Sequence, residues 1–170
     1  MTNPKKHLIT FAGPVGSSKS PIAYYLSHKL NLPIFNNDTI RTEITEDLIV
    51  FDQDEYIRRR DLRLKDLLDK NASFIYDASV DREWKNKYKI VNEYKYKYFI
   101  ISLDLSKDLL LKLYNAKGYH ESVERLEQLF IDHQNFLSEY SSIVGIHITD
   151  DNFYNRLEIC YDAVFKWLKK

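Results

Sequence analysis

The 170-residue sequence has one cysteine, four glycines and no excess of charge of either sign. Because Cys160 has no second cysteine to pair with, the chain can form neither an internal disulfide nor a metal site built on several thiolates. Lysine plus arginine and aspartate plus glutamate both number 25, so no overall field draws the protein to nucleic acid or to an anionic membrane. Any such contact must come from a local group of residues.

Long hydrophobic runs, internal repeats and low-complexity linkers are also missing. No apolar run has the length that crosses a bilayer, and the apolar stretch near the N-terminus is too short for a secretory signal. We therefore expect a cytoplasmic protein that makes no membrane contact. A chain of this length suits one hydrophobic core, so we predict a single domain over residues 1–170, as a monomer or weak dimer.

Short apolar runs of strand length alternate along the chain with segments of helical spacing. The runs are HLITFAG, LPIFN, SFIYD, YFIISLD and IVGIHIT. After them apolar residues recur every three or four positions, as at Ile22 and Leu26. This alternation predicts an α/β fold with a parallel sheet of about five strands and helices on both faces. Ligands of such sheets bind beyond the carboxyl ends of the strands, where Asp77 and Asp104 stand.

The stretch GPVGSSKS follows the first predicted strand and precedes the first predicted helix. It approaches the phosphate-binding pattern G-x-x-x-x-G-K-[ST], in which backbone N–H groups converge on phosphate oxygens. Lys19 would then contact the terminal phosphates of ATP, and the Ser20 hydroxyl would bind Mg²⁺. We predict a nucleotide site formed by Gly13, Pro14, Val15, Gly16, Ser17, Ser18, Lys19 and Ser20. An ordinary strand-to-helix turn is the alternative.

Two residues of this loop depart from the pattern. Ser18 stands where the second obligatory glycine belongs, and a positive φ there would cost on the order of 1–3 kcal/mol. Pro21 fits the first turn of a helix but has no N–H to offer a phosphate oxygen. Nucleotide binding is compatible with both changes, at reduced affinity.

With this loop, NNDTIR and YDASVDR in order, the whole chain resembles the small P-loop kinases of the AAA-type predicted kinase group. That group includes the kinase domains of polynucleotide 5'-hydroxyl kinases, the zeta toxins and, more distantly, shikimate-like kinases. The resemblance implies a P-loop NTPase fold, a three-layer sandwich with a small helical lid at about residues 112–125. It favours phosphoryl transfer from ATP, with Mg²⁺, without specifying the acceptor.

The resemblance also assigns residues. It implies that Asp38 deprotonates or orients the acceptor hydroxyl and that Arg41 steadies the acceptor, although a salt bridge from Arg41 to Asp38 or Glu43 is an alternative. Asp38 could also simply cap a helix. Asp77, of the DAS segment, is expected to support the metal together with Ser20 or to contact the acceptor, and Arg82 is the basic residue that follows it.

The predicted lid carries lysines where relatives often carry arginines. Lys112 and Lys117 supply positive charge without the planar fork of arginine, and Gly118 gives the freedom that a hinge needs. Solvated lysines near a helix C-terminus are the alternative. Asp104 is expected to cap the following helix rather than to act in catalysis.

Three further features have structural explanations. The segment KNKYKIVNEYKYKY could stack bases and neutralise phosphates, but its end, YKYKYF, also alternates as a half-buried strand does. RRRDLRLK could guide an anionic acceptor or form a solvated helix face. The five histidines show no metal-ligand spacing, and none is assigned to chemistry; Cys160 is expected in the core.

These observations lead to one main hypothesis and two alternatives. The chain is expected to transfer the γ-phosphoryl group of ATP to a hydroxyl of a small metabolite, a nucleotide or a 5'-hydroxyl nucleic-acid end. The first alternative is a nucleotide-binding regulator, or degenerate kinase, that binds ATP without efficient turnover. The second is a protein-interaction module that uses exposed tyrosines.

Overall fold

The five predicted strands form one parallel sheet in the computed structural model, which describes residues 6–170 apart from the side chains of residues 121 and 122. The strand order is β2-β3-β1-β4-β5. The strands are β1 (His7–Ala12), β2 (Ile34–Asn36), β3 (Phe74–Ser79), β4 (Lys97–Leu103) and β5 (Val144–Ile148). β1 therefore lies at the centre, and its carboxyl end leads directly into the glycine-containing loop.

Helices follow or separate the strands, as the sequence predicts. They are α1 (Lys19–Leu30), α2 (Asn37–Leu48), α3 (Gln53–Asp69), α4 (Trp84–Glu93), α5 (Lys107–Lys117), α6 (His120–Glu124), α7 (Leu126–Tyr140) and α8 (Arg156–Leu168). Two short 3-10 helices, η1 (Ser141–Ile143) and η2 (Asp150–Asn155), flank β5. The first turn of α1 contains Pro21, where a missing N–H is tolerated.

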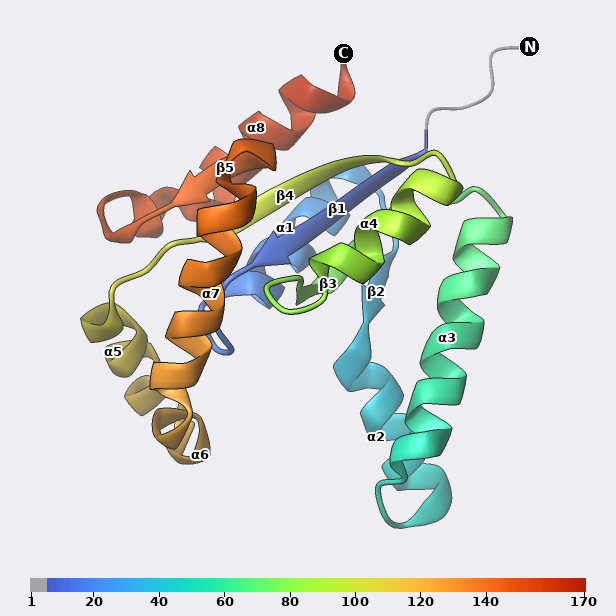
Figure 1. Ribbon diagram of the computed structural model, residues 1–170, viewed down its shortest axis with the longest axis horizontal. Helices are drawn as coiled ribbons and strands as arrows, with labels where there is room; N and C mark the ends of the chain where they lie inside the picture. Colours follow the sequence, from blue (N-terminus) through green and yellow to red (C-terminus); the bar gives the residue numbers. More distant parts are fainter. Residues whose placement is uncertain (1–5) are drawn as a thin grey trace.

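The sheet is covered on both faces, with α1 and α8 on one side and α4 and α7 on the other (Figure 1). Alternation along β1 supplies both cores: Ile9 and Phe11 pack with α1 and α8, whereas Ala12 packs with α4 and α7. Cys160 lies fully buried in the first of these cores, and burial raises the pKa of its thiol to about 12. The α/β fold and the core position of Cys160 are thus confirmed.

The tyrosine- and lysine-rich segment differs from the expected strand. Residues 84–93 form α4, Lys95 has a φ of 58°, and β4 begins only at Lys97. The N–H of Tyr96 bonds to the carbonyl of Val91 at 2.9 Å, which closes the end of α4. The alternation in YKYKYF therefore spans a helix end, a turn and a strand start, because a hydrogen-bonded helix C-terminus takes precedence over a two-residue period.

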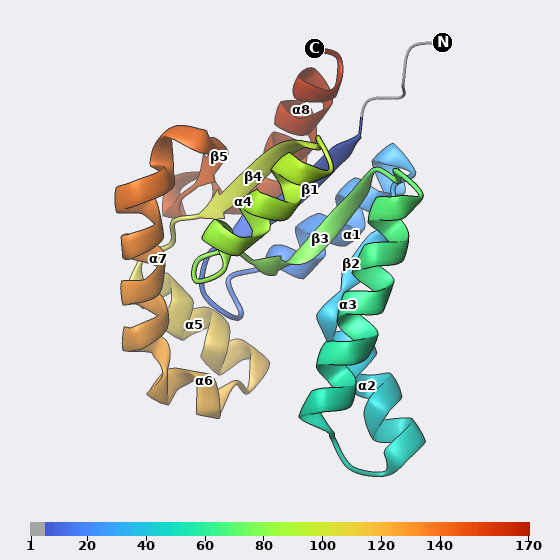
Figure 2. The same ribbon diagram turned by 45° about the vertical axis from the view of Figure 1, so that its right-hand side comes forward.

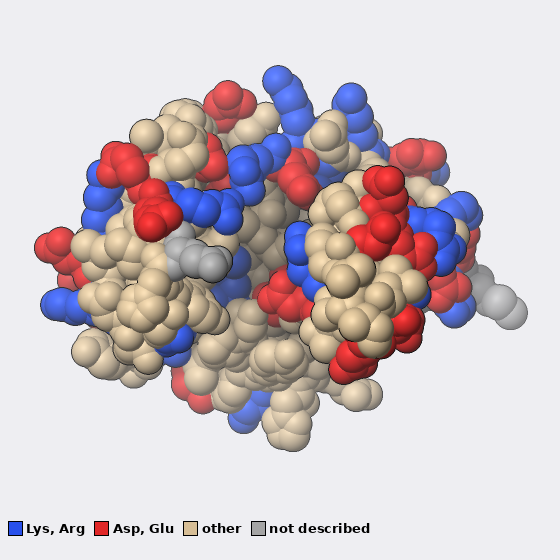
Figure 3. All heavy atoms as spheres, turned by 90° about the horizontal axis from the view of Figure 1, so that it is seen from below, with Lys and Arg blue, Asp and Glu red and all other residues tan. Residues whose placement is uncertain are grey.

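Two groups of helices project beyond the carboxyl ends of the strands. The α2–α3 pair extends on one side and α5, α6 and α7 on the other, as the two ribbon views show (Figures 1 and 2). Seen from below, the surface is hollowed between them, with charged side chains on both walls (Figure 3). In the described part of the chain, no helix is both long and apolar enough to cross a bilayer.

Candidate nucleotide-binding site

The loop after β1 has the backbone geometry that its glycines suggest. Gly13 has a φ of 135° and Gly16 a φ of 73°, conformations that residues with a Cβ rarely adopt. A Cβ on Gly13 would lie 2.9 Å from the Cβ of Leu103, and one on Gly16 would lie 2.7 Å from Cε1 of Tyr114. Glycine is therefore required at both positions by conformation and by space.

Ser18 also has a positive φ, of 80°, so the loop needs a left-handed residue where the pattern has its second glycine. The Ser18 side chain is buried, and its Oγ accepts a hydrogen bond of 2.9 Å from Nε of Arg156. Arg156 begins α8; its Nη1 donates to the Phe153 carbonyl at 3.0 Å, and its guanidinium lies 4.2 Å from the centre of the Phe153 ring. No pattern in the sequence signals this contact, which joins residues 138 positions apart.

The Lys19 side chain folds back over the loop. Its Nζ donates to the Gly13 carbonyl at 2.9 Å and to the Pro14 carbonyl, and lies 3.4 Å from Oγ of Ser17. Burial lowers the pKa of Lys19 to about 8, against the attraction of Asp81 and Asp77. The ammonium group thus lies inside the loop, where a phosphate would replace carbonyl oxygens as its partner.

Two more cations surround the loop. Nζ of Lys117 donates to the Gly16 carbonyl at 2.8 Å, and both burial and the charge of Arg156 lower the pKa of Lys117. Burial also lowers the pKa of Arg156, and Lys117 in turn lowers that of Lys19. Among the ion pairs between described side chains, which leave out those of residues 121 and 122, none involves Lys19, Lys117 or Arg156. Three cations that make no described ion pair thus lie around the loop, and Asp81 and Asp77 attract one of them, Lys19, from beyond ion-pair distance. Their positive charge lies beside the backbone N–H groups of the loop, an arrangement that attracts anions.

A cleft of about 560 Å³ opens beside the loop. It brings together most of the residues singled out from the sequence. Its described lining consists of Val15, Gly16, Ser18, Lys19, Ser20, Pro21, Asn37, Asp38, Asp77, Ala78, Ser79, Lys117 and Tyr119. Lys112 is exposed on α5 and does not belong to this lining.

The Asp77 carboxylate and the Ser20 hydroxyl lie together in the lining of the cleft. The Ser20 hydroxyl is hydrogen-bonded to the Asp77 carboxylate, which also accepts from Nδ2 of Asn36 at 2.9 Å. Burial is the largest influence on Asp77 and raises its pKa. In the described residues there is no cluster of three or more histidine, cysteine or acidic side chains for a metal. A hydroxyl and one carboxylate nevertheless suit Mg²⁺, which keeps few protein ligands and takes the rest from phosphates and water.

Asp38 lies in the first turn of α2, with an exposed carboxylate at the cleft. The helix cap is Asn36, whose Oδ1 accepts from the N–H groups of Asp38 at 2.7 Å and Thr39 at 3.2 Å. The alternative in which Asp38 is simply the cap of this helix is therefore excluded. Because Asn36 caps the N-terminus of α2, the Asp38 carboxylate is not needed to start this helix.

Arg41 and Arg82 do not line this cleft. The Arg41 guanidinium lies 4.6 Å from the centre of the Phe51 ring and 4.6 Å from that of the Tyr56 ring. Neither of the alternative salt bridges, to Asp38 or to Glu43, is among the ion pairs of the described side chains. Arg82 lies 3.6 Å from Asp132 and borders an adjoining cleft of about 390 Å³ on the far side of the loop. Their roles toward an acceptor remain predictions.

A second group of residues, not foreseen from the sequence, lies behind the loop. Asp81 accepts from the N–H of Gly13, and the ring of His133 contacts both Asp81 and Asp104. The expectation that Asp104 caps the following helix is wrong, because Ser106 is that cap and accepts from the N–H of Leu109. No spacing rule connects these residues, since four different segments supply them.

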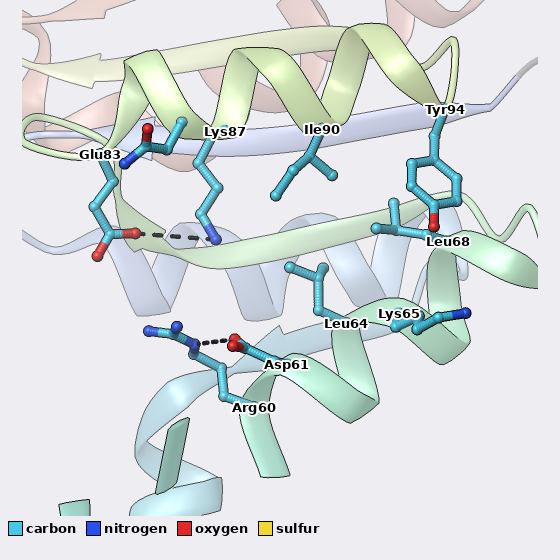
Figure 4. Close-up of a pocket in the computed structure, with 10 residues that line it drawn as sticks. Arg60, Asp61, Leu64, Lys65, Leu68, Glu83, Lys87, Ile90 and Tyr94 are labelled. Atoms are coloured by element: carbon cyan, nitrogen blue, oxygen red, sulfur yellow. Dashed lines mark hydrogen bonds and ion pairs between the residues drawn. The ribbon is translucent and has the colours of Figure 1, made fainter. Parts of the chain in front are cut away.

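A separate groove of about 430 Å³ lies between α3 and α4 (Figure 4). Leu64, Leu68 and Ile90 line it together with Arg60 and Lys87, and Arg60 pairs with Asp61 at 2.9 Å. The other arginines of RRRDLRLK pair with acidic residues as well: Arg58 and Arg59 with Glu55, and Arg63 with Glu43. This helix face is therefore charge-compensated, as a solvated surface is.

Comparison with known proteins places the fold. No protein-family model matches the chain, and no curated protein matches it in sequence. Among solved structures, a gluconokinase from Sinorhizobium meliloti is 12% identical at a TM-score of 0.62, covering 98% of this chain and 96% of that one. The APS kinase from Mycobacterium tuberculosis, in complex with AMPPNP and APS, is 17% identical at 0.59, covering 95% and 99%.

A third similar structure is the deoxyadenosine kinase from M. mycoides, 19% identical at a TM-score of 0.57 over 94% of this chain and 99% of that one. At these identities the likeness concerns the fold alone. The chain shares with these three kinase structures an α/β fold built on a parallel sheet with helices on both faces.

Proposed function

We propose that the protein is an ATP-dependent phosphotransferase, a kinase that transfers the γ-phosphoryl group to a hydroxyl. The observation that carries the proposal is a group of three cations, Lys19, Lys117 and Arg156, that make no ion pair with the described side chains and surround a loop with left-handed residues. A polyphosphate would satisfy these charges and the N–H groups of the loop at once. The fold of the similar structures supports the same assignment.

We assign the residues of the cleft different roles in phosphoryl transfer according to their chemistry. The loop and Lys19 would bind the β- and γ-phosphates, and Lys117 would add positive charge from the lid side. The Ser20 hydroxyl and the Asp77 carboxylate are the oxygens that would hold Mg²⁺. When bound, this ion neutralises charge on the phosphates.

Asp38 is the group that would accept the proton of the acceptor hydroxyl. Its carboxylate is exposed, shares the cleft with Lys19 and Asp77, and is not needed to cap α2. A general base must reach the proton that it removes, and Asp38 is the acidic residue at the α2 wall of this cleft. The acceptor class stays open between a small metabolite, a nucleotide and a 5'-hydroxyl nucleic-acid end.

The test is the Asp38→Asn variant, assayed for MgATP binding by calorimetry and for phosphoryl transfer across hydroxyl compounds and 5'-hydroxyl oligonucleotides. We expect transfer to be lost and ATP binding to be retained. Glu43→Gln is the matched control, since Glu43 lies on the same helix but outside the cleft. Transfer by Asp38→Asn at the wild-type rate would refute the role of Asp38.

A second candidate function has a specific observation in its favour. The Lys19 ammonium donates to two backbone carbonyls of its own loop, and burial lowers its pKa to about 8. Both features weaken the binding of phosphate by Lys19. A regulator that binds a nucleotide with little turnover would tolerate this loss of affinity, whereas an efficient kinase would not. Binding of MgATP without ATP consumption in the presence of any acceptor would favour this candidate, and the absence of binding would exclude both.

A further inference from the structure

His133 lies at the centre of a buried charge network behind the loop. Its Nδ1 lies 3.1 Å from Oδ1 of Asp81, its Nε2 lies 2.9 Å from Oδ1 of Asp104, and the residue is 1% exposed. Ionised carboxylates only accept hydrogen bonds, so both ring nitrogens must donate. With both carboxylates ionised, the geometry is that of an imidazolium cation.

Asp81 connects this cation to the first residue of the loop. The N–H of Gly13 donates to both carboxylate oxygens of Asp81, at 3.1 Å each. Gly13 has the φ of 135° that starts the loop, so Asp81 holds the residue at which β1 turns away from the sheet. On the other side of the ring, Asp104 also accepts from the Ser102 hydroxyl and contacts Nδ1 of His147.

The charge of His133 also matters to Lys19. Asp81 is the strongest attraction on the Lys19 ammonium and raises its pKa against the effect of burial. An imidazolium in contact with Asp81 offsets that negative charge. Without it, Asp81 would hold Lys19 more strongly and would repel the phosphates that Lys19 is meant to bind.

We propose that His133 is a positioning residue for the nucleotide site, which fixes Asp81 against the Gly13 N–H and offsets its charge beside Lys19. The proposal rests on the proposed function in that the bound ligand is a nucleotide. His133 itself touches no substrate; it acts through Asp81.

The groups that face His133 support this state of the ring. Burial lowers the pKa of His133, but Asp104 and Asp81 together raise it to about 9, above its usual value of 6.5. Asp81 follows β3, Asp104 follows β4, and His147 on β5 reaches the network through Asp104. At neutral pH the ring therefore stays charged.

The experiment compares the wild type with His133→Gln at pH 7, where the wild-type ring is charged. Glutamine keeps one donor toward a carboxylate but lacks the charge and the second donor. We expect MgATP to bind about tenfold more weakly, the size expected for one lost hydrogen bond to a charged group. Hydrogen exchange of the Gly13 amide should also become faster. His28→Gln, at an exposed position of α1, is the control and should change neither.

A double variant tests the charge argument directly. In Asp81→Asn/His133→Gln the carboxylate is gone while an amide oxygen can still accept from the Gly13 N–H. We expect MgATP affinity to recover relative to His133→Gln alone. A merely structural role of His133 predicts no recovery, and that result would overturn the proposal.

Two further outcomes separate this proposal from the proposed function. If the wild type binds no MgATP, the function fails, and the exchange of the Gly13 amide still decides whether His133 positions the loop. If His133→Gln does not fold, ¹⁵N shifts of the wild-type ring between pH 6 and 8 decide. A neutral imidazole there would overturn the proposal, and an imidazolium would support it.

Discussion

The contact between Ser18 and Arg156 leads to a quantitative prediction, because strain and hydrogen bonding act in opposite directions at Ser18. A non-glycine residue in the left-handed region costs about 1–2 kcal/mol. The buried hydrogen bond from the charged Arg156 to Oγ of Ser18 is worth about 1.5–3 kcal/mol. Serine is therefore tolerated where the pattern has glycine because the second contribution is at least as large as the first.

Three variants separate these contributions to the free energy of unfolding. Ser18→Ala keeps the strain and loses the hydrogen bond, so we expect a loss of about 2 kcal/mol. Ser18→Gly also loses the hydrogen bond, but it relieves the backbone strain. The greater flexibility of glycine in the unfolded chain takes back about 0.5–1 kcal/mol of that gain. It should therefore be more stable than Ser18→Ala. In an Arg156→Met background, Ser18→Gly should be neutral or stabilising.

The assay is urea unfolding of the four proteins of the Ser18→Gly and Arg156→Met cycle. We expect a coupling energy of about 1.5–3 kcal/mol between the two positions. Lys95→Gly is the control for strain alone, because Lys95 has a φ of 58° and an exposed side chain. Additivity of the two substitutions within about 0.5 kcal/mol would refute the compensation argument.

Three other predictions concern pH and packing. Because burial lowers the pKa of Lys19 to about 8 and phosphate favours its charged form, MgATP affinity measured by calorimetry should fall about tenfold per pH unit above pH 8, and no slope there would contradict this. The pKa of His133 in the folded protein is about 9, above its ordinary value of 6.5, so the charged ring stabilises the fold fully below pH 6.5 and this stabilisation is lost as pH rises through 9. The difference in free energy of unfolding between wild type and His133→Gln should therefore shrink by about 3 kcal/mol over that range. A constant difference would count against this prediction. Gly145→Ala places a Cβ 2.4 Å from Cε2 of the buried Phe99, so urea unfolding should show a loss of about 1–3 kcal/mol, whereas wild-type stability would mean that the ring moves freely.

Local patterns in the sequence were sufficient for the fold and for the strand–loop–helix arrangement around Gly13–Ser20. Strand-length runs and helical spacing specify the five strands and most of the helices, because each element must bury one face. The loop Gly13–Ser20 is recognisable because its conformation needs small residues over a short stretch. Asp38 and Asp77 were identified by their positions at strand ends, which a parallel sheet brings to one edge.

Other assignments failed where the local signal was ambiguous. Asp38 and Asp104 were plausible helix caps, but Asn36 and Ser106 occupy those positions, since neighbouring polar residues compete for the same N–H groups. The tyrosine–lysine alternation of YKYKYF belongs to a strand only from Lys97 on, because the hydrogen bonds that end α4 leave no trace in a two-residue period.

The sequence by itself determined the layered α/β architecture and the phosphate-type loop, since both depend on residues close together in the chain. Only the tertiary structure decided which distant groups support that loop. Arg156 reaches Ser18 from the start of α8, and His133 on α7 joins Asp81 and Asp104 from the ends of β3 and β4. Charged groups that are far apart in the sequence interact only after the sheet has brought the carboxyl ends of its strands to one edge. No local spacing of residues predicts which of these groups will meet there.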